Sequence, residues 1–209
     1  LSWALGFTVA KAGLAEFPPL LLMSMRFFIA ALVLVWFVPI PRNCMKDLFW
    51  VALVGSTIQY GLTFTGLSMI DASLAIIVVH LEVPFGILLA VLLFRERPGI
   101  QRLAGMGIAF GGIVMIAGLP SVKGQLFAVA LTGSGAMIWA IGQIMYKRIS
   151  DRVTGLSAVA WIGLIAGGQM ALASLLLESG QLDALLHATR IGWGSVVYLG
   201  LIMTVLGYG

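Results

Sequence analysis

Eight long runs of apolar residues dominate this sequence and limit what it can fold into. The hydrocarbon core of a bilayer is about 30 Å thick, which takes roughly 20 residues of helix to cross. The runs cover 1–16, 19–38, 48–69, 73–94, 103–119, 125–146, 155–177 and 191–209. They are continuously apolar rather than alternating, so each is expected to be a helix and not a barrel strand. The sequence therefore predicts an all-α, polytopic bundle of transmembrane helices.

The composition excludes most classes of soluble protein. Hydrophobic residues make up 61% of the 209 positions and charged residues only 10%, against about half and a quarter in a typical soluble domain. The net charge is +4, but the basic residues lie between the apolar runs, so the expected partner is the lipid bilayer and not nucleic acid. A single cysteine, Cys44, excludes an internal disulfide and a cysteine-rich metal centre.

The distribution of Lys and Arg gives the expected orientation in the membrane. The connections after the second, fourth and sixth runs hold Arg42, Lys46, Arg95, Arg97, Arg102, Lys147, Arg148 and Arg152, whereas the opposite ends hold Lys11, Lys123 and Arg190. Because Lys and Arg accumulate on the cytoplasmic side, the first set of connections and the N-terminus are predicted to be cytoplasmic. The link 178–190 contains Leu182, Leu185 and Leu186, which favour a small interfacial helix.

The sequence also repeats itself. Trp3-Ala4-Leu5-Gly6 with Lys11 returns 136 residues later as Trp139-Ala140-Ile141-Gly142 with Lys147. The stretch that begins at Trp50 returns 148 residues later at Tyr198, and in it Ser56 matches Thr204 and Tyr60-Gly61 matches Tyr208-Gly209. The first run thus corresponds to the sixth and the third to the eighth.

A repeat unit of five helices has a topological consequence. Five is odd, so the second copy must cross the membrane in the inverted orientation, as in secondary transporters. The first copy is predicted at 1–119 and the second at 120–209. Leu119 lies 58 positions after Gly61, so roughly 60 further residues are expected after Gly209 by the repeat rule. The chain is accordingly expected to hold eight spans of ten and to be clipped at both ends.

Several stretches, in a consistent order, resemble the EamA-type family of the drug/metabolite transporter (DMT) superfamily. They are Trp3 to Lys11 with Leu14, Pro18-Pro19 and Arg26-Phe27; Ala72 to Ala75; Pro84-Phe85 with Arg95-Glu96-Arg97; Gln101, Gly105 and Gly111-Gly112; Trp139 to Lys147; and Gly207-Tyr208-Gly209. The resemblance implies a ten-helix carrier of the bacterial inner membrane, similar to exporters of amino acids and metabolites. It also implies a central cavity among spans one, three, four, six, eight and nine. His80 and Glu82 depart from the pattern, since similar exporters usually carry uncharged residues there.

Glu82 is the strongest candidate for transport chemistry. It lies near the middle of the fourth run, where a charged side chain costs about 2.5–3.5 kcal/mol on insertion scales. This cost disfavours the ionised form, so Glu82 is expected to bind and release a proton during transport. The structural alternatives are a protonated residue bonded to another helix and an ion pair with Arg26.

Pro84 predicts a kink in the same helix. Proline has no amide hydrogen, so the carbonyl of His80 loses its helical donor. Interrupted helices are common at transporter sites, although many kinks serve only packing. His80 and Glu82 would face nearly opposite ways on a regular helix, so they share a ligand only if Pro84 distorts the turn. His80 itself is either a proton relay or a hydrogen-bond donor to a neighbouring helix.

The remaining site candidates are one cation and a set of amide and aromatic side chains. Arg26, about two turns inside the second run, is expected to form an ion pair with Glu16 or Glu82; snorkelling and contact with an anionic substrate group are the alternatives. The uncharged candidates are Gln59, Tyr60, Trp3, Trp139, Gln143 and Tyr146. Such groups suit a zwitterionic or aromatic metabolite, whereas the structural alternatives are helix–helix hydrogen bonds and interfacial anchors. Lys11 is expected to snorkel.

Two G-x-x-x-G motifs predict close helix packing: Gly107 with Gly111, and Gly163 with Gly167. Such motifs also pair helices of separate chains, so a homodimer is compatible with the sequence but not required by it.

The sequence as a whole predicts a secondary active transporter that exports small metabolites such as amino acids in exchange for protons, by alternating access of two inverted halves. It contains no GxxxxGK or GxGxxG motif after a strand and no metal-ligand cluster, so neither a cofactor nor a metal is expected. A passive facilitator on the same fold is the main alternative. An integral membrane enzyme is disfavoured, because the two histidines, His80 and His187, lie far apart and form no HExxH motif.

Overall fold

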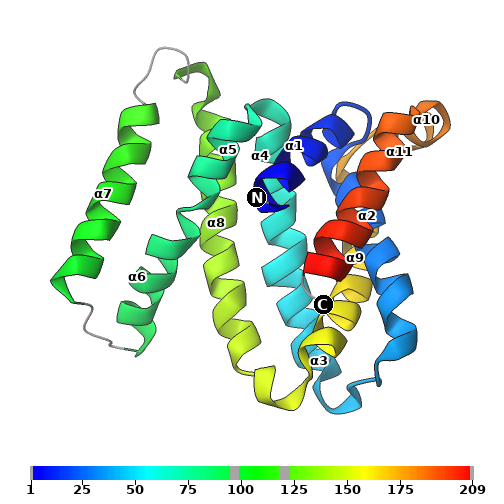
Figure 1. Cartoon of the computed structure of the whole chain (residues 1–209), viewed down its shortest axis with the longest axis horizontal. Helices are drawn as coiled ribbons and strands as arrows, with labels where there is room; N and C mark the ends of the chain where they lie inside the picture. Colours follow the sequence, from blue (N-terminus) through cyan, green and yellow to red (C-terminus); the bar gives the residue numbers. More distant parts are fainter. Residues whose placement is uncertain (1, 95–98, 118–122, 208–209) are drawn as a thin grey trace.

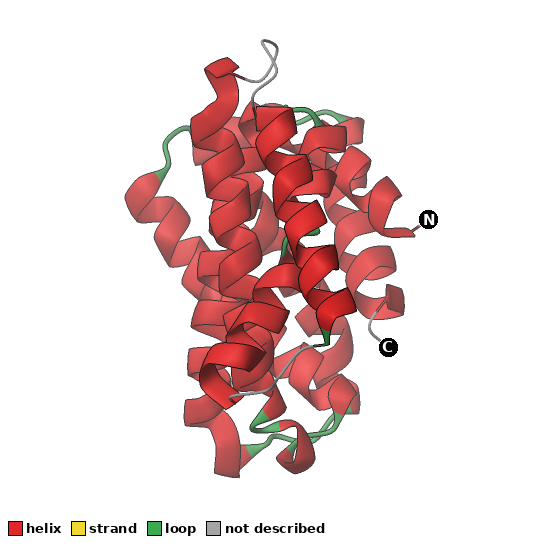
Figure 2. Cartoon of the chain, turned by 90° about the vertical axis from the view of Figure 1, so that its left-hand side faces the viewer, coloured by secondary structure: helices red, strands yellow, loops and turns green. Residues whose placement is uncertain are grey.

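A computed structural model describes residues 2–94, 99–117 and 123–207. In these ranges every regular element is a helix, and the helices lie side by side (Figures 1 and 2), which confirms the all-α bundle. The α-helices are α1 (Ser2–Leu14), α2 (Pro19–Leu34), α3 (Met45–Ala52), α4 (Gln59–Met69), α5 (Ala72–Val79), α6 (Glu82–Phe94), α7 (Ile100–Ala117), α8 (Leu126–Lys147), α9 (Gly155–Leu177), α10 (Gln181–His187) and α11 (Arg190–Val197). π-Helical segments follow α3 at Leu53–Ile58 and α11 at Tyr198–Leu206.

These helices account for the predicted membrane spans. Five stretches of the described residues are long and apolar enough to cross a bilayer: Pro19–Phe37, Arg42–Met69, Ala72–Leu93, Leu126–Lys147 and Gly155–Leu177. A bent pair, Gln181–His187 with Arg190–Val205, forms a sixth candidate, and the shorter apolar helices Leu5–Leu14 and Ile100–Ile116 occupy the first and fifth predicted runs. The first member of the bent pair, α10, is the predicted short helix. It meets its partner at 105°, with Leu182 and Leu186 exposed.

The helices alternate in direction, so their connections gather at two ends of the molecule (Figure 1). The end with the α1–α2 and α4–α5 connections and α10 is called the Glu16 end, and the end with the α2–α3 and α8–α9 connections is called the Asp47 end. Lys11, near the end of α1, contacts the last carbonyls of α4, and Ile149, just beyond α8, packs with Leu48 of α3. Helices α1 and α8 therefore run in opposite directions.

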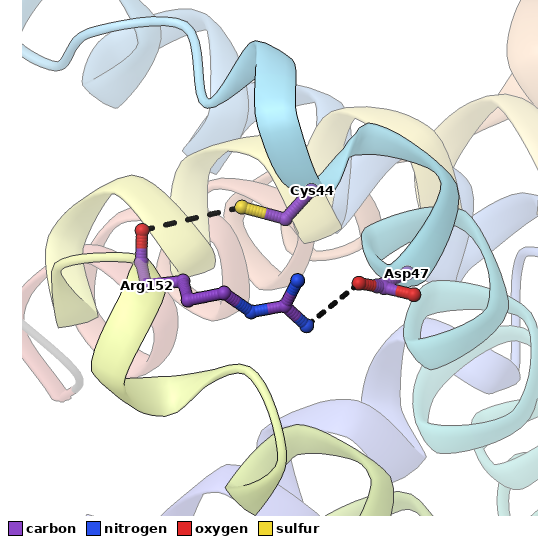
Figure 3. Close-up of polar contacts among 3 residues, drawn as sticks. All are labelled: Cys44, Asp47 and Arg152. Atoms are coloured by element: carbon purple, nitrogen blue, oxygen red, sulfur yellow. Dashed lines mark hydrogen bonds and ion pairs between the residues drawn. The ribbon is translucent and has the colours of Figure 1, made fainter.

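At the Asp47 end, connections that lie far apart in the sequence meet (Figure 3). Nη2 of Arg152 lies 2.7 Å from Oδ2 of Asp47, and the Cys44 thiol lies 4.0 Å from the Arg152 carbonyl oxygen. The two charged side chains are 51% and 47% exposed, so this ion pair stabilises the fold by about 1 kcal/mol at most. Trp161 Nε1, in α9, donates to the carbonyl of Pro39 at 3.1 Å, which links α9 to the α2–α3 connection.

At the Glu16 end, two glutamates hold the beginnings of distant helices. Glu178, just beyond α9, accepts the amides of Leu20 at 2.7 Å and Leu21 at 3.2 Å in the first turn of α2. Glu16 accepts the amide and the hydroxyl of Thr189, the residue before α11, at 2.6 Å each. The first amides of a helix lack intrahelical acceptors and carry the positive end of its dipole, so carboxylates stabilise them. The hydrogen bonds from the Thr189 hydroxyl and amide hold the pKa of the Glu16 carboxyl below its ordinary value.

Helices α2 and α9 pack closely against each other. A Cβ at Gly163 would lie 3.6 Å from the Phe27 carbonyl oxygen, and one at Gly167 would lie 3.2 Å from the ring of Phe28. Ser24 Oγ donates to the Gly167 carbonyl at 3.1 Å. These contacts confirm the close packing predicted for the G-x-x-x-G motif of α9.

The corresponding prediction for α7 is wrong within one copy of the chain. A Cβ placed on Gly107 or Gly111 would find no described heavy atom within 4 Å. The motif lies on helix surface that the described residues leave uncovered, so its role in a homodimer stays a prediction.

Each π-helical segment packs against a glycine of another helix. Gly55, in the first segment, meets Gly142 of α8 backbone to backbone; a Cβ on Gly55 would lie 3.2 Å from the Gly142 Cα. Met203, in the second segment, covers Gly6 of α1, where a Cβ would lie 2.9 Å from the methionine sulfur. π-Helical turns are rare and occur frequently at functional sites, and both segments border the cavities described next.

Candidate functional site

A cavity of about 440 Å³ lies inside the bundle, bordered by α1, α2, α4, α5, α6, α8 and the second π-helical segment. Its volume falls in the range of about 300–1,000 Å³ that is usual for small-molecule sites. Six of the nine predicted site residues lie on its wall: Glu82, His80, Gln59, Tyr60, Trp139 and Arg26. We refer to it as the central cavity.

The helix of the fourth run is interrupted beside this cavity, next to Pro84. α5 ends immediately before His80, and α6 begins at Glu82. Because Pro84 has no amide hydrogen, the His80 carbonyl accepts from the Val83 amide instead, at 3.3 Å. The interruption places His80 and Glu82 on the same cavity wall, which a regular helix would not. Nδ1 of His80 lies 2.7 Å from the Ile76 carbonyl oxygen.

Glu82 occupies the first turn of α6 and is partly exposed. It lines the central cavity and also a second cavity of about 560 Å³ between α6 and α8, whose wall includes Arg102 and Lys147. Trp139 is the other residue common to both walls. Glu82 therefore lies where the two cavities adjoin.

Arg26 is the buried cation of the site, with 3% of its surface exposed. Its Nε donates to Thr204 Oγ1 at 3.1 Å. Its Cζ lies 5.1 Å from the centroid of the Tyr60 ring and 5.6 Å from that of Phe27, within the range of cation–π attraction. Its Nη2 has no hydrogen-bond partner among the described residues, so one side of the guanidinium is fixed and the N–H groups of Nη2 are left free.

The ion pair predicted for Arg26 is wrong. In the described ranges the salt bridges are Arg152 with Asp47 and His187 with Asp183, and neither Glu16 nor Glu82 contributes to one. Glu16 instead binds the start of α11 at the end of the bundle. The hydroxyl of Thr204 takes the position at Nε, and the two aromatic rings lie beside the guanidinium carbon, so among the described residues no acidic side chain binds Arg26 and Nη2 stays open.

Gln59 lies one turn of α4 before Thr63, to whose Oγ1 its Nε2 donates at 3.1 Å. Its side chain is buried, with 6% of the residue exposed, and its Oε1 accepts no hydrogen bond from any described residue. Both residues line the central cavity.

The other predicted site residues lie elsewhere. Gln143 and Tyr146 line an adjoining cavity of about 320 Å³ that shares Tyr60 and Trp139 with the central one. The side chain of Trp3 lies outside the part of the chain that the structure describes.

The sequence did not single out much of the cavity wall. The additional lining residues are Gly6, Phe7, Thr63, Phe64, Ile76, Val79, Leu199 and Met203. Phe64 stacks between two rings, 5.5 Å from Tyr60 and 6.1 Å from Phe7 between centroids. These residues are small or apolar members of apolar runs, so nothing in the sequence distinguishes them from core. For Thr204, which binds Arg26, the signal in the sequence was its repeat match with Ser56.

Lys11 does not snorkel. Its Nζ donates to the carbonyls of Leu67 at 2.8 Å, Ser68 at 3.0 Å and Ile70 at 2.8 Å. It therefore satisfies the carbonyls at the C-terminal end of α4, where a cation also meets the negative end of the helix dipole.

Comparison with known proteins identifies the family of this chain. The model of the EamA-like transporter family matches residues 1–118, more than half of the chain. The chain belongs to this family. As an EamA-like transporter it is an integral membrane protein with a small-molecule substrate.

Relatives of this EamA-like transporter carry transporter names. The "Probable amino-acid metabolite efflux pump" of Salmonella typhimurium is 33% identical over 99% of this chain and 72% of that protein. A protein of the same name in Escherichia coli K12 is also 33% identical, with the same shares covered. The "Uncharacterized inner membrane transporter YedA" of E. coli K12 is 26% identical over 98% of this chain and 67% of that protein.

A solved crystal structure shares the fold. It superposes on this EamA-like transporter with a TM-score of 0.57 at 16% sequence identity, covering 100% of this chain and 86% of the other. At that identity the likeness concerns the fold alone.

Proposed function

We propose that this EamA-like transporter is a secondary active carrier that exports small metabolites, amino acids among them, in exchange for protons. The observation that carries the proposal is a cavity of small-molecule size beside an interrupted helix, with the Glu82 carboxyl at the interruption. Interrupted helices at the midplane are typical of transporter sites. The names of the Salmonella and E. coli relatives support the substrate class and the outward direction.

Alternating access between two inverted halves, 1–119 and 120–209, is part of the proposal. Two observations support it. First, α1 and α8, which the 136-residue offset matches, run in opposite directions. Second, the contact between them and the π-helical segments occurs twice: Gly142 meets Gly55, and Gly6 meets Met203. The offsets of 136 and 148 residues relate one pair to the other.

The packing of α2 on α9 supports the same symmetry. Gly163 lies against Phe27, and these two positions are themselves 136 residues apart. A residue that packs on its own repeat partner lies next to the symmetry axis. In the proposal, α2 and α9 therefore form the central contact about which the halves rock.

The proton role belongs to Glu82 in this proposal. A carboxyl group between two adjoining cavities exchanges protons with whichever cavity is hydrated, and protonation removes the cost of its charge in the membrane. When Glu82 takes up a proton from one side of the membrane and releases it to the other, proton movement is coupled to substrate movement.

A test uses proteoliposomes with an imposed pH gradient. The wild type is expected to concentrate amino acid against its gradient, whereas Glu82→Gln, which has no proton to release, is expected only to equilibrate it while still exchanging substrate. Asp183→Asn is the matched control, because this acid lies on α10 with its side chain 82% exposed. Wild-type pH dependence in Glu82→Gln contradicts the proton role. A wild type that merely equilibrates identifies a facilitator.

The orientation is tested with reporter fusions. We expect reporters placed after Arg42 and after Arg148, both near the Asp47 end, to be cytoplasmic, because these connections carry the excess of basic residues. A reporter after Glu178, at the Glu16 end, is expected on the opposite side of the membrane and serves as the control. An external signal after Arg42 or Arg148 contradicts the proposed orientation.

A further inference from the structure

Two buried polar atoms of the central cavity have no partner. Throughout the described ranges, Arg26 Nη2 and Gln59 Oε1 are the buried side-chain nitrogen and oxygen atoms without a hydrogen bond. A buried group left unsatisfied costs about 1–3 kcal/mol, and more when it is charged. Both residues line the same cavity, so a molecule bound there can satisfy both.

The free donor belongs to a cation that is already held in position. Thr204 fixes Nε of Arg26, and the rings of Tyr60 and Phe27 hold the guanidinium carbon. A planar guanidinium whose orientation is fixed is well suited to bind a carboxylate. A phosphate dianion fits this wall less well, because Glu82 lies on the same cavity and, of the described residues that line it, Arg26 is the lone Lys or Arg.

The second atom without a partner, Oε1 of Gln59, is a hydrogen-bond acceptor. Oε1 of Gln59 can accept from an N–H group, and the carboxyl of Glu82 and the indole of Trp139, which line the same wall, favour a cationic nitrogen. The rest of the wall is largely apolar, with Phe7, Phe64 and Met203 among its residues. The cavity thus combines one anion receptor, one ammonium receptor and an apolar lining.

We infer that the central cavity binds a zwitterionic α-amino acid with an apolar side chain, with Arg26 Nη2 donating to the substrate carboxylate and Gln59 Oε1 accepting from its ammonium group. This inference rests on the proposed carrier function and identifies the chemical groups of the substrate that the carrier recognises. The binding of one substrate satisfies both orphaned atoms at once, and loss of either substrate group leaves a buried polar atom unpaired.

The inference is tested by substrate exchange in proteoliposomes, which needs no proton gradient. Labelled phenylalanine is the probe, and the competitors are phenylalanine, its methyl ester, phenethylamine and N-acetylphenylalanine. In the wild type the ester and the amine, which lack the carboxylate, are expected to compete at least about 10-fold more weakly than phenylalanine, the equivalent of one unsatisfied hydrogen bond. N-acetylphenylalanine, which lacks the ammonium group, is expected to be similarly weak.

Substitutions of Arg26 and Gln59 test which residue binds the carboxylate and which binds the ammonium group of the substrate. Arg26→Gln is expected to raise KM for phenylalanine about 10-fold or more and to leave competition by the ester unchanged, so the preference for the acid is lost. Arg26→Lys keeps the charge without the planar fork and is expected to recover part of that preference. Gln59→Leu is expected to lose discrimination against the N-acetyl compound alone. Arg152→Gln is the control, since that arginine lies in the exposed pair at the Asp47 end.

The outcomes separate this inference from the function on which it rests. A wild type that exchanges none of the probes contradicts the carrier proposal for amino acids. A wild type that exchanges phenylalanine but accepts the ester equally well overturns the inference and leaves the carrier intact; this comparison needs no variant to fold. Retention of the acid preference in Arg26→Gln likewise overturns it and makes Arg26 a structural cation.

Discussion

The Gly142→Ala variant is expected to lose about 3 kcal/mol of unfolding free energy. A Cβ at this position falls on the backbone of Gly55 in the first π-helical segment. No side chain at that contact can rotate away, so the two helices must separate, and overpacking of this kind costs about 1–3 kcal/mol or more. The loss occurs although alanine is the better helix former by about 1 kcal/mol. Thermal or denaturant unfolding of the purified protein in detergent measures the difference.

Gly133→Ala is the matched control for this variant. It lies in the same helix, α8, and its added Cβ would meet Val78 Cγ1 at 3.7 Å and Leu81 Cδ1 at 4.0 Å, which is ordinary contact. It gains the same helix propensity, so it is expected to be neutral or slightly stabilising. Equal stability of the two variants would show that the helices at Gly142 are not in backbone contact.

Lys11→Met is the second substitution with a large expected effect, a loss of about 3 kcal/mol. Methionine keeps the length of the apolar stem but donates no hydrogen bond. Three carbonyls at the end of α4, those of Leu67, Ser68 and Ile70, then lose their donor, and each bond to a charged group is worth about 1.5–3 kcal/mol. Water reaches the partly buried site and replaces part of the lost hydrogen bonding. The expected loss of unfolding free energy is therefore less than the sum over the three bonds. The same unfolding assay measures it.

The repeat supplies the control. Lys147 matches Lys11 in the repeat but is exposed at the end of α8, so Lys147→Met is expected to change stability by less than about 0.5 kcal/mol. A large effect of Lys147→Met, or none of Lys11→Met, would contradict the role assigned to Lys11.

The sequence was a good guide where one helix decides the outcome. The ends of the membrane spans follow from the length of each apolar run, because the bilayer sets that length. The interruption before Glu82 follows from the missing amide of Pro84, which is a local property of one turn. Six of the nine site candidates reached the central cavity because polar residues within a membrane span rarely face lipid.

The predictions that failed depend on which helix lies opposite. The expected partner of Arg26 was a carboxylate, but the residue beside its Nε is Thr204, 178 positions later. Lys11 reaches the end of α4 instead of the interface because that end lies next to α1. The motifs Gly107 with Gly111 and Gly163 with Gly167 have the same spacing, yet within the described ranges only the second has a helix against it. The residue pattern within one helix does not show which other helix will pack against it.

At the Glu16 end, the carboxylates that bind the starts of α2 and α11 come from distant parts of the chain. This arrangement links the order of synthesis to the completion of the fold. Leu20 receives its acceptor from Glu178, which is 158 positions further along the chain. At translation rates of about 5–20 residues per second, the ribosome adds that carboxylate roughly 8–30 s after the helix it completes. During this interval the leading amides of α2 depend on lipid headgroups or water. The earliest membrane helices therefore reach their final state only when late-emerging segments arrive, so the nascent protein matures as a whole rather than piece by piece.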